Sequence, residues 1–231
     1  MLPKTITITV DVEPDLHGGT YNGVNRGLKT FEIMCDEHKI KPVLFVTADC
    51  IKRFPSLFKR LNKKGWEISS HGFSHKRFDE MPISEKRKEI EKSIYLFKNY
   101  LNIKPKGFRA PQHSIDDKTL NFLEEYGFEY DSSYTPLNLF QLFFFPKKIL
   151  LWAKCFFSPI NPYRIRKNLV ERPTAAFIFP FVSLLVRVLP KRAIYYYIRV
   201  LSLFYKNPIF YCHSWDFIKM KESRIDRIFS H

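Results

Sequence analysis

KTITITVDVEPD, residues 4–15, is the stretch that decides the fold of this 231-residue chain. Thr alternates with Ile and Val along residues 4–12, and this alternation of β-branched residues predicts a β-strand. The strand leads directly into three carboxylates, Asp11, Glu13 and Asp15. Because catalytic groups of α/β proteins collect at the carboxyl ends of buried strands, these acids mark a candidate active site.

Strand-like and helical segments alternate along much of the remaining chain. Strands are predicted at residues 42–48, 66–71, 107–111, 128–133 and 208–213. Helices are predicted at residues 24–39, 54–65, 83–102 and 116–127. This order is typical of a parallel-strand α/β fold, and we expect residues 1–231 to form one barrel-like domain.

Residues 137–206 break the alternation, and we expect them to form a divergent, aromatic-rich helical insertion. Stretches such as FIFPFVSLLVRVLP mix apolar residues with cations and fall short of the roughly 20 apolar residues that span a membrane. Two interpretations remain open: helices buried against the barrel, or an interfacial wedge resting on a membrane. The wedge interpretation uses Lys147, Lys148, Trp152, Arg187, Lys191 and Arg192.

The net charge of +15 favours either an anionic partner or a solvated basic surface. No signature of a nucleic-acid-binding module accompanies it, so nucleic acid is not expected as a partner.

The four cysteines are far apart and form no CxxC pair, which is typical of reduced thiols. The N-terminus turns polar before an apolar signal segment can form. We therefore expect a cytoplasmic protein, with peripheral association to the anionic inner face of the cytoplasmic membrane under the wedge interpretation.

The segment SSHGFSH, residues 69–75, carries the most informative spacing in the chain. Two imidazoles four residues apart, His71 and His75, lie close together on a helical turn and can chelate one divalent metal ion. The same spacing also fits one surface and one core histidine. The position directly after a strand favours the metal site, and the acids at the end of the first strand can supply the missing carboxylate ligand.

Two other polar residues follow predicted strands. His213 ends PIFYCH, residues 208–213, and can serve as a general acid, although packing on Trp215 would give it a structural role instead. Arg109 ends the strand within GFRAP, residues 107–111. There it can pair with a catalytic carboxylate and hold it ionised, or it can be an ordinary surface arginine.

Taken in order, these motifs resemble the polysaccharide deacetylase family, the NodB-like carbohydrate esterases of family 4 type. The first motif has the acid-x-acid form of one branch of that family. The resemblance covers residues 5 to about 135 and then 208–217. The five motifs read Asp11-Val12-Glu13, His71 to His75, Arg109-Ala110-Pro111, Tyr130 to Ser133, and His213.

The resemblance implies a deformed (β/α) barrel and metal-dependent hydrolysis of the N-acyl group, most simply N-acetyl, of an amino sugar. The substrate would be a glycan, a lipid-linked sugar or a nucleotide-linked sugar. The residues implied by the resemblance are Glu13, His71 and His75 as ligands of one divalent ion, expected to be Zn²⁺, Asp11 as base, Arg109 as its partner, His213 as general acid, and Asp131, Trp215 and Pro111 as substrate-binding groups.

Two departures from the family's pattern keep a second function open. Glu13 stands where the family usually has Asp, and Gly72 stands where a hydroxyl residue is common. The longer Glu13 side chain changes where a metal would sit, and some relatives lack the metal. The alternative is therefore a non-catalytic module that binds a glycan or a membrane on a deacetylase scaffold.

Overall fold

The computed structural model describes residues 3, 5–15, 19–139 and 149–218. Its main sheet has eight strands in the order β10-β1-β2-β3-β4-β5-β7-β6. Neighbouring strands are parallel except for β6 and β7, which are antiparallel. The strands are β1 (Thr7–Val12), β2 (Val43–Val46), β3 (Glu67–Ser70), β4 (Gly107–Phe108), β5 (Tyr130–Asp131), β6 (Tyr163–Arg164), β7 (Val170–Glu171) and β10 (Ile209–His213).

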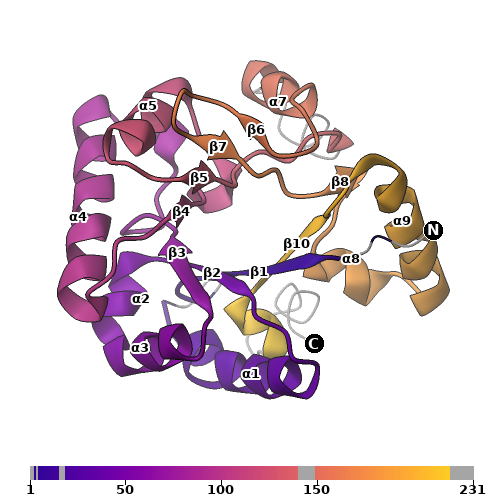
Figure 1. The fold of residues 1–231 in the computed structure, drawn as a ribbon, viewed down its shortest axis with the longest axis horizontal. Helices are drawn as coiled ribbons and strands as arrows, with labels where there is room; N and C mark the ends of the chain where they lie inside the picture. Colours follow the sequence, from indigo (N-terminus) through magenta and orange to yellow (C-terminus); the bar gives the residue numbers. More distant parts are fainter. Residues whose placement is uncertain (1–2, 4, 16–18, 140–148, 219–231) are drawn as a thin grey trace.

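Helices cover the outside of this curled sheet, as Figure 1 shows, so the predicted deformed (β/α) barrel is confirmed. The helices of the first part of the chain are η1 (Gly23–Gly27), α1 (Leu28–Glu37), α2 (Ala48–Arg53), α3 (Pro55–Lys63), α4 (Ile83–Leu101) and α5 (Asp117–Glu125). The helices of the second part are α7 (Ile149–Phe156), α8 (Ser183–Val188) and α9 (Lys191–Phe204). Short 3₁₀ turns among the described residues are η2 (Phe78–Glu80), η3 (Pro111–His113) and η5 (Ser214–Phe217).

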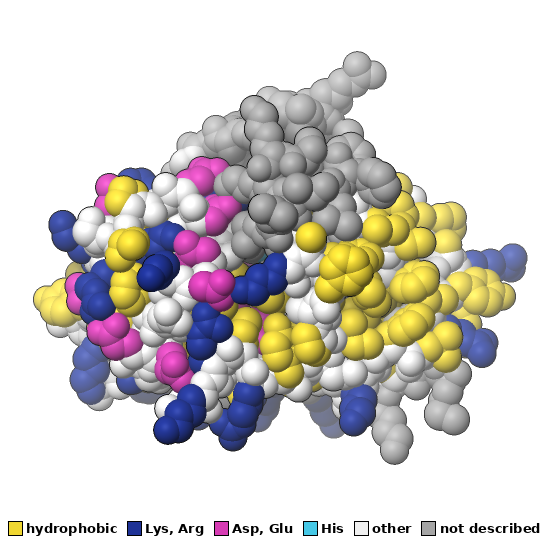
Figure 2. Space-filling view, turned by 90° about the horizontal axis from the view of Figure 1, so that it is seen from above, with side chains coloured by type: hydrophobic (Ala, Val, Ile, Leu, Met, Phe, Trp, Pro, Cys, Tyr) yellow, Lys and Arg dark blue, Asp and Glu magenta, His cyan; other side chains and the backbone are white. Residues whose placement is uncertain are grey.

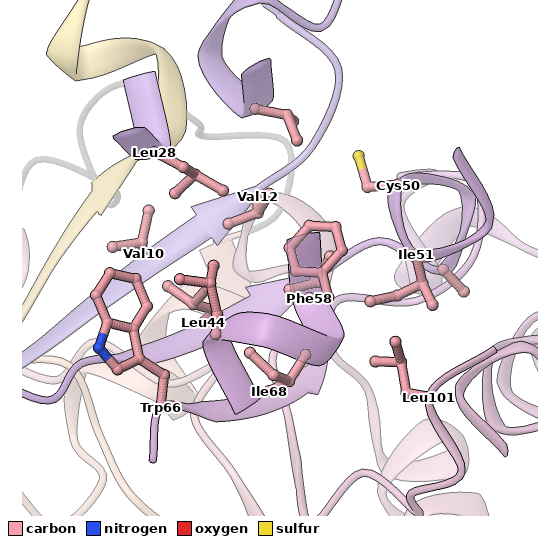
Figure 3. Close-up of a cluster of buried hydrophobic side chains, with 14 of the residues drawn as sticks. Val10, Val12, Leu28, Leu44, Cys50, Ile51, Phe58, Trp66, Ile68 and Leu101 are labelled. Atoms are coloured by element: carbon pink, nitrogen blue, oxygen red, sulfur yellow. The ribbon is translucent and has the colours of Figure 1, made fainter. Parts of the chain in front are cut away.

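Alternation along β1 separates the core from the barrel interior. Val10 and Val12 point toward α1 to α3 and pack with Leu44 and Phe58, as Figure 3 shows. Each such side chain stabilises the fold by roughly 1.5–3 kcal/mol when fully buried. Asp11, between the two valines, points to the opposite face of the sheet. The same alternation that builds the core therefore sends an acid into the barrel.

Residues 137–206 do more than add helices. Two of their strands, β6 and β7, extend the main sheet next to β5, and β8 (Ala176–Phe177) and β9 (Phe179–Pro180) form a separate hairpin. The composition of this segment predicted the helices but not these strands. Lys147 and Lys148 lie outside the described residues. Within the described part of the chain, none of the helices has the length and hydropathy required to cross a bilayer.

Candidate active site

The carboxyl ends of the parallel strands bring the predicted site residues to one edge of the sheet. Asp11 and His213 are register partners on neighbouring strands β1 and β10. His71 directly follows β3, and Arg109 directly follows β4. The sheet curls, so these residues converge on one centre: the Arg109 side chain bonds to Asp11, and the His71 ring bonds to the carbonyl oxygen of Arg109.

Glu13, His71 and His75 form the candidate metal site at this edge. Their ligand atoms all lie within 4.8 Å of one another. The Oε2 atom of Glu13 contacts the Nε2 atom of His75 and lies 3.6 Å from the Nε2 atom of His71. Two imidazoles and a carboxylate are a known ligand set for a three-ligand catalytic zinc site. The extra methylene of Glu13 therefore does not take the carboxylate out of reach of the histidines.

The state of Glu13 also fits a bound cation. Its Oε2 atom is buried and has no hydrogen bond of normal geometry. Burial by itself would raise the pKa of Glu13, but the neighbouring imidazoles of His71 and His75 outweigh it and lower the pKa of the carboxyl below its usual range. The carboxylate is therefore ionised at neutral pH. A buried anionic oxygen without a normal hydrogen-bond donor is costly unless a cation compensates it.

The tautomer of His71 is set by the backbone of the neighbouring strand. Its Nδ1 atom lies 2.8 Å from the carbonyl oxygen of Arg109. Because a carbonyl oxygen can only accept, Nδ1 carries the proton and donates it. The Nε2 atom, which faces Glu13, is then the ring nitrogen that can bind a metal, and holding the other nitrogen by a backbone carbonyl is the usual arrangement of a metal-binding histidine.

His75 reaches the site from a loop, so the expectation of a helical turn over the two histidines was wrong. The backbone takes left-handed conformations at Gly72 (φ +75°) and His75 (φ +58°), which an α-helical turn does not contain. A side chain at position 72 would also approach the ring of Phe78 to 3.2 Å. These constraints explain the glycine in a place where the family commonly has a hydroxyl residue.

Glu89 on α4 holds this loop in place, and the sequence did not single it out. Its carboxylate accepts hydrogen bonds from the backbone N–H groups of Phe73 (3.1 Å) and Ser74 (2.9 Å) and from the Ser74 hydroxyl (2.7 Å). Three bonds from one carboxylate thus fix the chain just before His75. His75 itself stays partly exposed, with 27% of its side chain accessible, so the site opens on this side.

Asp11 and Arg109 form a buried ion pair beside the metal site. The Nη1 atom of Arg109 donates to Asp11 Oδ1 at 2.7 Å and to Thr9 Oγ1 at 3.0 Å. Its other nitrogens donate to the carbonyl and hydroxyl of Ser132, and its guanidinium lies 4.1 Å from the ring centroid of Phe45. Burial would raise the pKa of Asp11, but Arg109 and the nearby histidines lower it, so the carboxylate is ionised.

His213 is oriented by Trp215 and Asp216. Its ring stacks on the indole of Trp215 with 4.4 Å between centroids and 8° between planes. Its backbone N–H donates to Asp216 Oδ2 at 2.7 Å, and its Nδ1 lies 3.8 Å from the same oxygen. Burial would lower the pKa of His213, but Asp216 and the other acids raise it to about 9. The imidazole is therefore protonated at neutral pH, as a general acid requires.

Asp15, the third acid of the first motif, supports the fold around this histidine. Its carboxylate accepts hydrogen bonds from the backbone N–H groups of Asn22 (2.6 Å) and Gly23 (2.8 Å), where η1 begins. Helix η1 then packs tightly on η5, the turn that follows His213. A Cβ atom on Gly27 would lie 2.0 Å from the carbonyl oxygen of Ser214, so only glycine permits this approach.

The three predicted substrate-binding residues lie in different surroundings. Trp215 is 4% exposed, and Pro111 is buried at the start of η3, two residues after Arg109. Asp131 has no exposed surface and bonds to the hydroxyl and the backbone N–H of Ser133. A sugar would therefore not touch Asp131 in this conformation, whereas Trp215 lies against the candidate general acid.

Two buried titratable residues near the site were missed from the sequence. Burial and Arg109 lower the pKa of His113 to about 4, so it is neutral, and its Nδ1 lies 2.8 Å from the Ser133 carbonyl oxygen. Glu171 on β7 is the register partner of Asp131. Burial and the Asp131 carboxylate raise the pKa of Glu171 well above its usual range, so the pair holds a proton.

A curled sheet of mostly parallel strands, covered by helices and with polar residues gathered at its carboxyl edge, is the architecture of the NodB-like deacetylase barrels. Residues 1–130, more than half of the chain, match the family described as Polysaccharide deacetylase. The chain therefore belongs to the polysaccharide deacetylase family, as its motifs predicted.

The chain is also similar to individual proteins, one in sequence and two in fold. The chain is 32% identical over 111 residues to a peptidoglycan deacetylase-like protein of Gibberella zeae, and this match covers 48% of the chain and 32% of that protein. The aligned region thus spans about a third of the curated relative. A polysaccharide deacetylase structure from Mycobacterium smegmatis superposes with a TM-score of 0.66 at 18% identity, covering 91% of this chain and 76% of the other. An allantoinase structure gives 0.65 at 14% identity, with 91% and 77% covered.

Because less than a tenth of the chain is left out of either superposition, most of residues 137–206 has a counterpart in these folds. This segment is divergent in sequence, but it is part of the common architecture.

Proposed function

We propose that this protein hydrolyses the N-acyl group, most simply N-acetyl, of an amino sugar, with Glu13, His71 and His75 holding one divalent ion. The observation that carries the proposal is the meeting of these three ligands with Asp11 and His213 at one strand edge. Zn²⁺ suits the two imidazoles and single carboxylate best. Such an ion, when bound, supplies Lewis-acid activation of water and of the amide carbonyl.

The side chains of this protein then divide the two proton transfers. Asp11, held ionised by Arg109, accepts a proton as water attacks the amide carbonyl carbon. His213, protonated through Asp216, donates a proton to the sugar nitrogen as the C–N bond breaks. The products are a free carboxylate and an amino sugar. Trp215 keeps the imidazole ring of His213 in one plane and offers an apolar wall beside it.

The direct test is release of acetate from N-acetylated amino sugars, presented as soluble oligomers, nucleotide-linked sugars and lipid-linked sugars. We expect the zinc-loaded protein to release acetate and the His71→Ala variant to lose both zinc and activity. His38→Ala is the matched control, because His38 is an exposed histidine at the end of α1. Full activity after exhaustive chelation would remove the metal from the proposal.

The alternative function, a non-catalytic binding module on the same scaffold, rested on Glu13. The contact of its carboxylate with both histidines favours the enzyme instead. A zinc-loaded protein that binds N-acetylated sugars but releases no acetate from any of them would support the binding module.

A further inference from the structure

Positive charge is concentrated in the second part of the chain. Residues 135–215 contain twelve Lys and Arg and a single acidic residue, Glu171, which is fully buried. This segment therefore supplies +11 of the net charge of +15. Lys154, Arg166 and Arg187 pair with acids outside the segment, and no exposed acidic side chain within it balances the other cations.

Helix α9, within this segment, is apolar on two sides. Its inward face packs Leu201, Tyr197 and Ile198 against Phe181 and its neighbours. Its exposed residues recur three and four positions apart, so they form one outward face. Those residues are Lys191, Arg192, Tyr195, Tyr196, Arg199, Leu203 and Phe204.

The β8–β9 hairpin continues this outward face. The Tyr197 hydroxyl accepts a hydrogen bond from the backbone N–H of Phe177 at 3.0 Å and donates to the carbonyl of Phe179, so the hairpin is fixed to α9. The Phe177 ring stacks on Phe204 with 5.2 Å between centroids. We use the term α9 face for the exposed apolar set Ile178, Phe179, Val188, Tyr195, Tyr196, Leu203 and Phe204.

Figure 2 shows this surface as a gathering of hydrophobic side chains on the side of the molecule where α9 lies, with Lys and Arg at its outer edge. The exposure is large: Tyr196 is 64% and Leu203 is 75% accessible. Lys191, Arg192 and Lys206 form no ion pair with any residue that the structure describes, and Arg199 lies 5.9 Å from the ring centroid of Tyr195.

Two residues of the sequence-based wedge do not belong to this surface. Trp152 is buried at 4% exposure, and Arg187 bonds to the side chain and backbone of Asp216. The remaining pattern of aromatic and aliphatic side chains among unpaired cations, with no acids, is the composition of an interfacial helix that lies in a membrane surface. A purely apolar partner would give the cations no anionic group to contact. A nucleic acid would leave the apolar side chains of Leu203 and Val188 exposed to water.

We propose that the α9 face docks the protein onto an anionic lipid bilayer, with the apolar side chains entering the headgroup region and the α9 cations contacting lipid phosphates. Aromatic and aliphatic groups supply the non-polar contribution, and each Lys or Arg near an anionic leaflet adds a further favourable contribution that falls off within a Debye length. This inference is independent of the catalytic proposal, because none of its residues belongs to the candidate active site.

The test is co-sedimentation of the full chain with vesicles of phosphatidylcholine alone or mixed with phosphatidylglycerol. One variant removes apolar contacts (Tyr196→Ser with Leu203→Ser), and another removes charge (Lys191→Gln with Arg192→Gln). The matched control is Tyr95→Ser on α4, because Tyr95 has the same 64% exposure on a different face. Thermal melting verifies that each variant is folded.

We expect binding to the anionic vesicles only, reduced at least about tenfold in either α9 variant and at high salt, and unchanged in the Tyr95→Ser control. Equal loss in the control would mean that the α9 face has no special role. Absence of binding to anionic vesicles at low salt would overturn the proposal. So would a solution dimer that the Tyr196→Ser, Leu203→Ser variant converts to monomers, because the face would then be an interface between two copies.

Discussion

Replacing Asp11 by Asn should lower both the stability of the barrel interior and the rate of hydrolysis. Asn keeps the shape of Asp and still accepts the 2.7 Å hydrogen bond from Arg109. It removes the negative charge that neutralises a guanidinium with no exposed surface. The change therefore leaves a buried cation without its ion-pair partner.

The size of the effect follows from that burial. Removing one member of a buried ion pair costs about 3–5 kcal/mol. Because the hydrogen bond survives and Thr9 still accepts from Arg109, the lower value of roughly 3 kcal/mol applies. For a chain of this length each kcal/mol lowers the Tm by about 2–4 °C, so the Tm should fall by about 6–12 °C. Loss of the base should also lower kcat by about 10²–10⁴-fold.

Thermal unfolding and acetate release measure the two effects, and zinc analysis shows that the ligand set is intact. Asp117→Asn is the matched control, because Asp117 also pairs with an arginine at 2.8 Å, that of Arg166, but is 60% exposed. An exposed pair of this kind contributes about 1 kcal/mol or less. An unchanged Tm for Asp11→Asn would refute the buried ion pair, and full activity would refute Asp11 as the base.

Three other perturbations test the remaining parts of the site. His75→Ala should abolish the stabilisation of the protein by zinc. For the parent protein this stabilisation reaches about 2.7 kcal/mol at a zinc concentration 100 times the Kd. An equal rise in Tm on adding zinc to both proteins would contradict the ligand set. His213→Gln should lower kcat by about 10²–10⁴-fold while zinc content stays the same, as measured by metal analysis and acetate release. Gly27→Ala should lower the free energy of unfolding by about 1–3 kcal/mol and reduce kcat, because the added Cβ would displace Ser214 next to His213. An unchanged melting curve would show that η1 and η5 are not tightly packed.

The position of the site was predictable because parallel strands place their carboxyl ends together. Asp11, His71, Arg109, Asp131 and His213 were selected as polar residues at the ends of strands. The structure brings all five to one edge of the sheet, although Asp131 is fully buried there. Strand chemistry alone thus locates them. Their individual roles remain predictions, because proximity at a strand edge does not assign a base or an acid.

The geometry around the two histidines could not be derived from spacing. The HxxxH interval indicated a helical turn, but the loop is shaped by Gly72 and held by Glu89, which is 14 residues beyond His75 on α4. Such a tertiary hydrogen bond leaves no local pattern. Helix α2 was missed for a different reason, because β2 runs into it with Thr47 as the only residue between them.

Two missed residues did leave a signal. Glu171 is the only acid among residues 135–215, and an isolated acid in so basic a segment indicates burial or function. Asp216 follows His213 by three residues, the spacing at which a side chain can bond back to the first backbone N–H of a turn, as the 2.7 Å bond shows. His113 had only its closeness to Arg109 in the sequence to single it out.

The segment that least resembles the family in sequence is thus built into the site. Strand β7 supplies Glu171, which sits against Asp131 on the strand next to β4 and Arg109. Helix α8 supplies Ser183 and Arg187, which bond to the two carboxylate oxygens of Asp216 at 2.5 Å each. Asp216 in turn orients the candidate general acid. Because Val188 at the end of the same six-residue helix belongs to the α9 face, one short helix carries both a residue of the surface proposed to meet the bilayer and the residues that hold Asp216 beside His213.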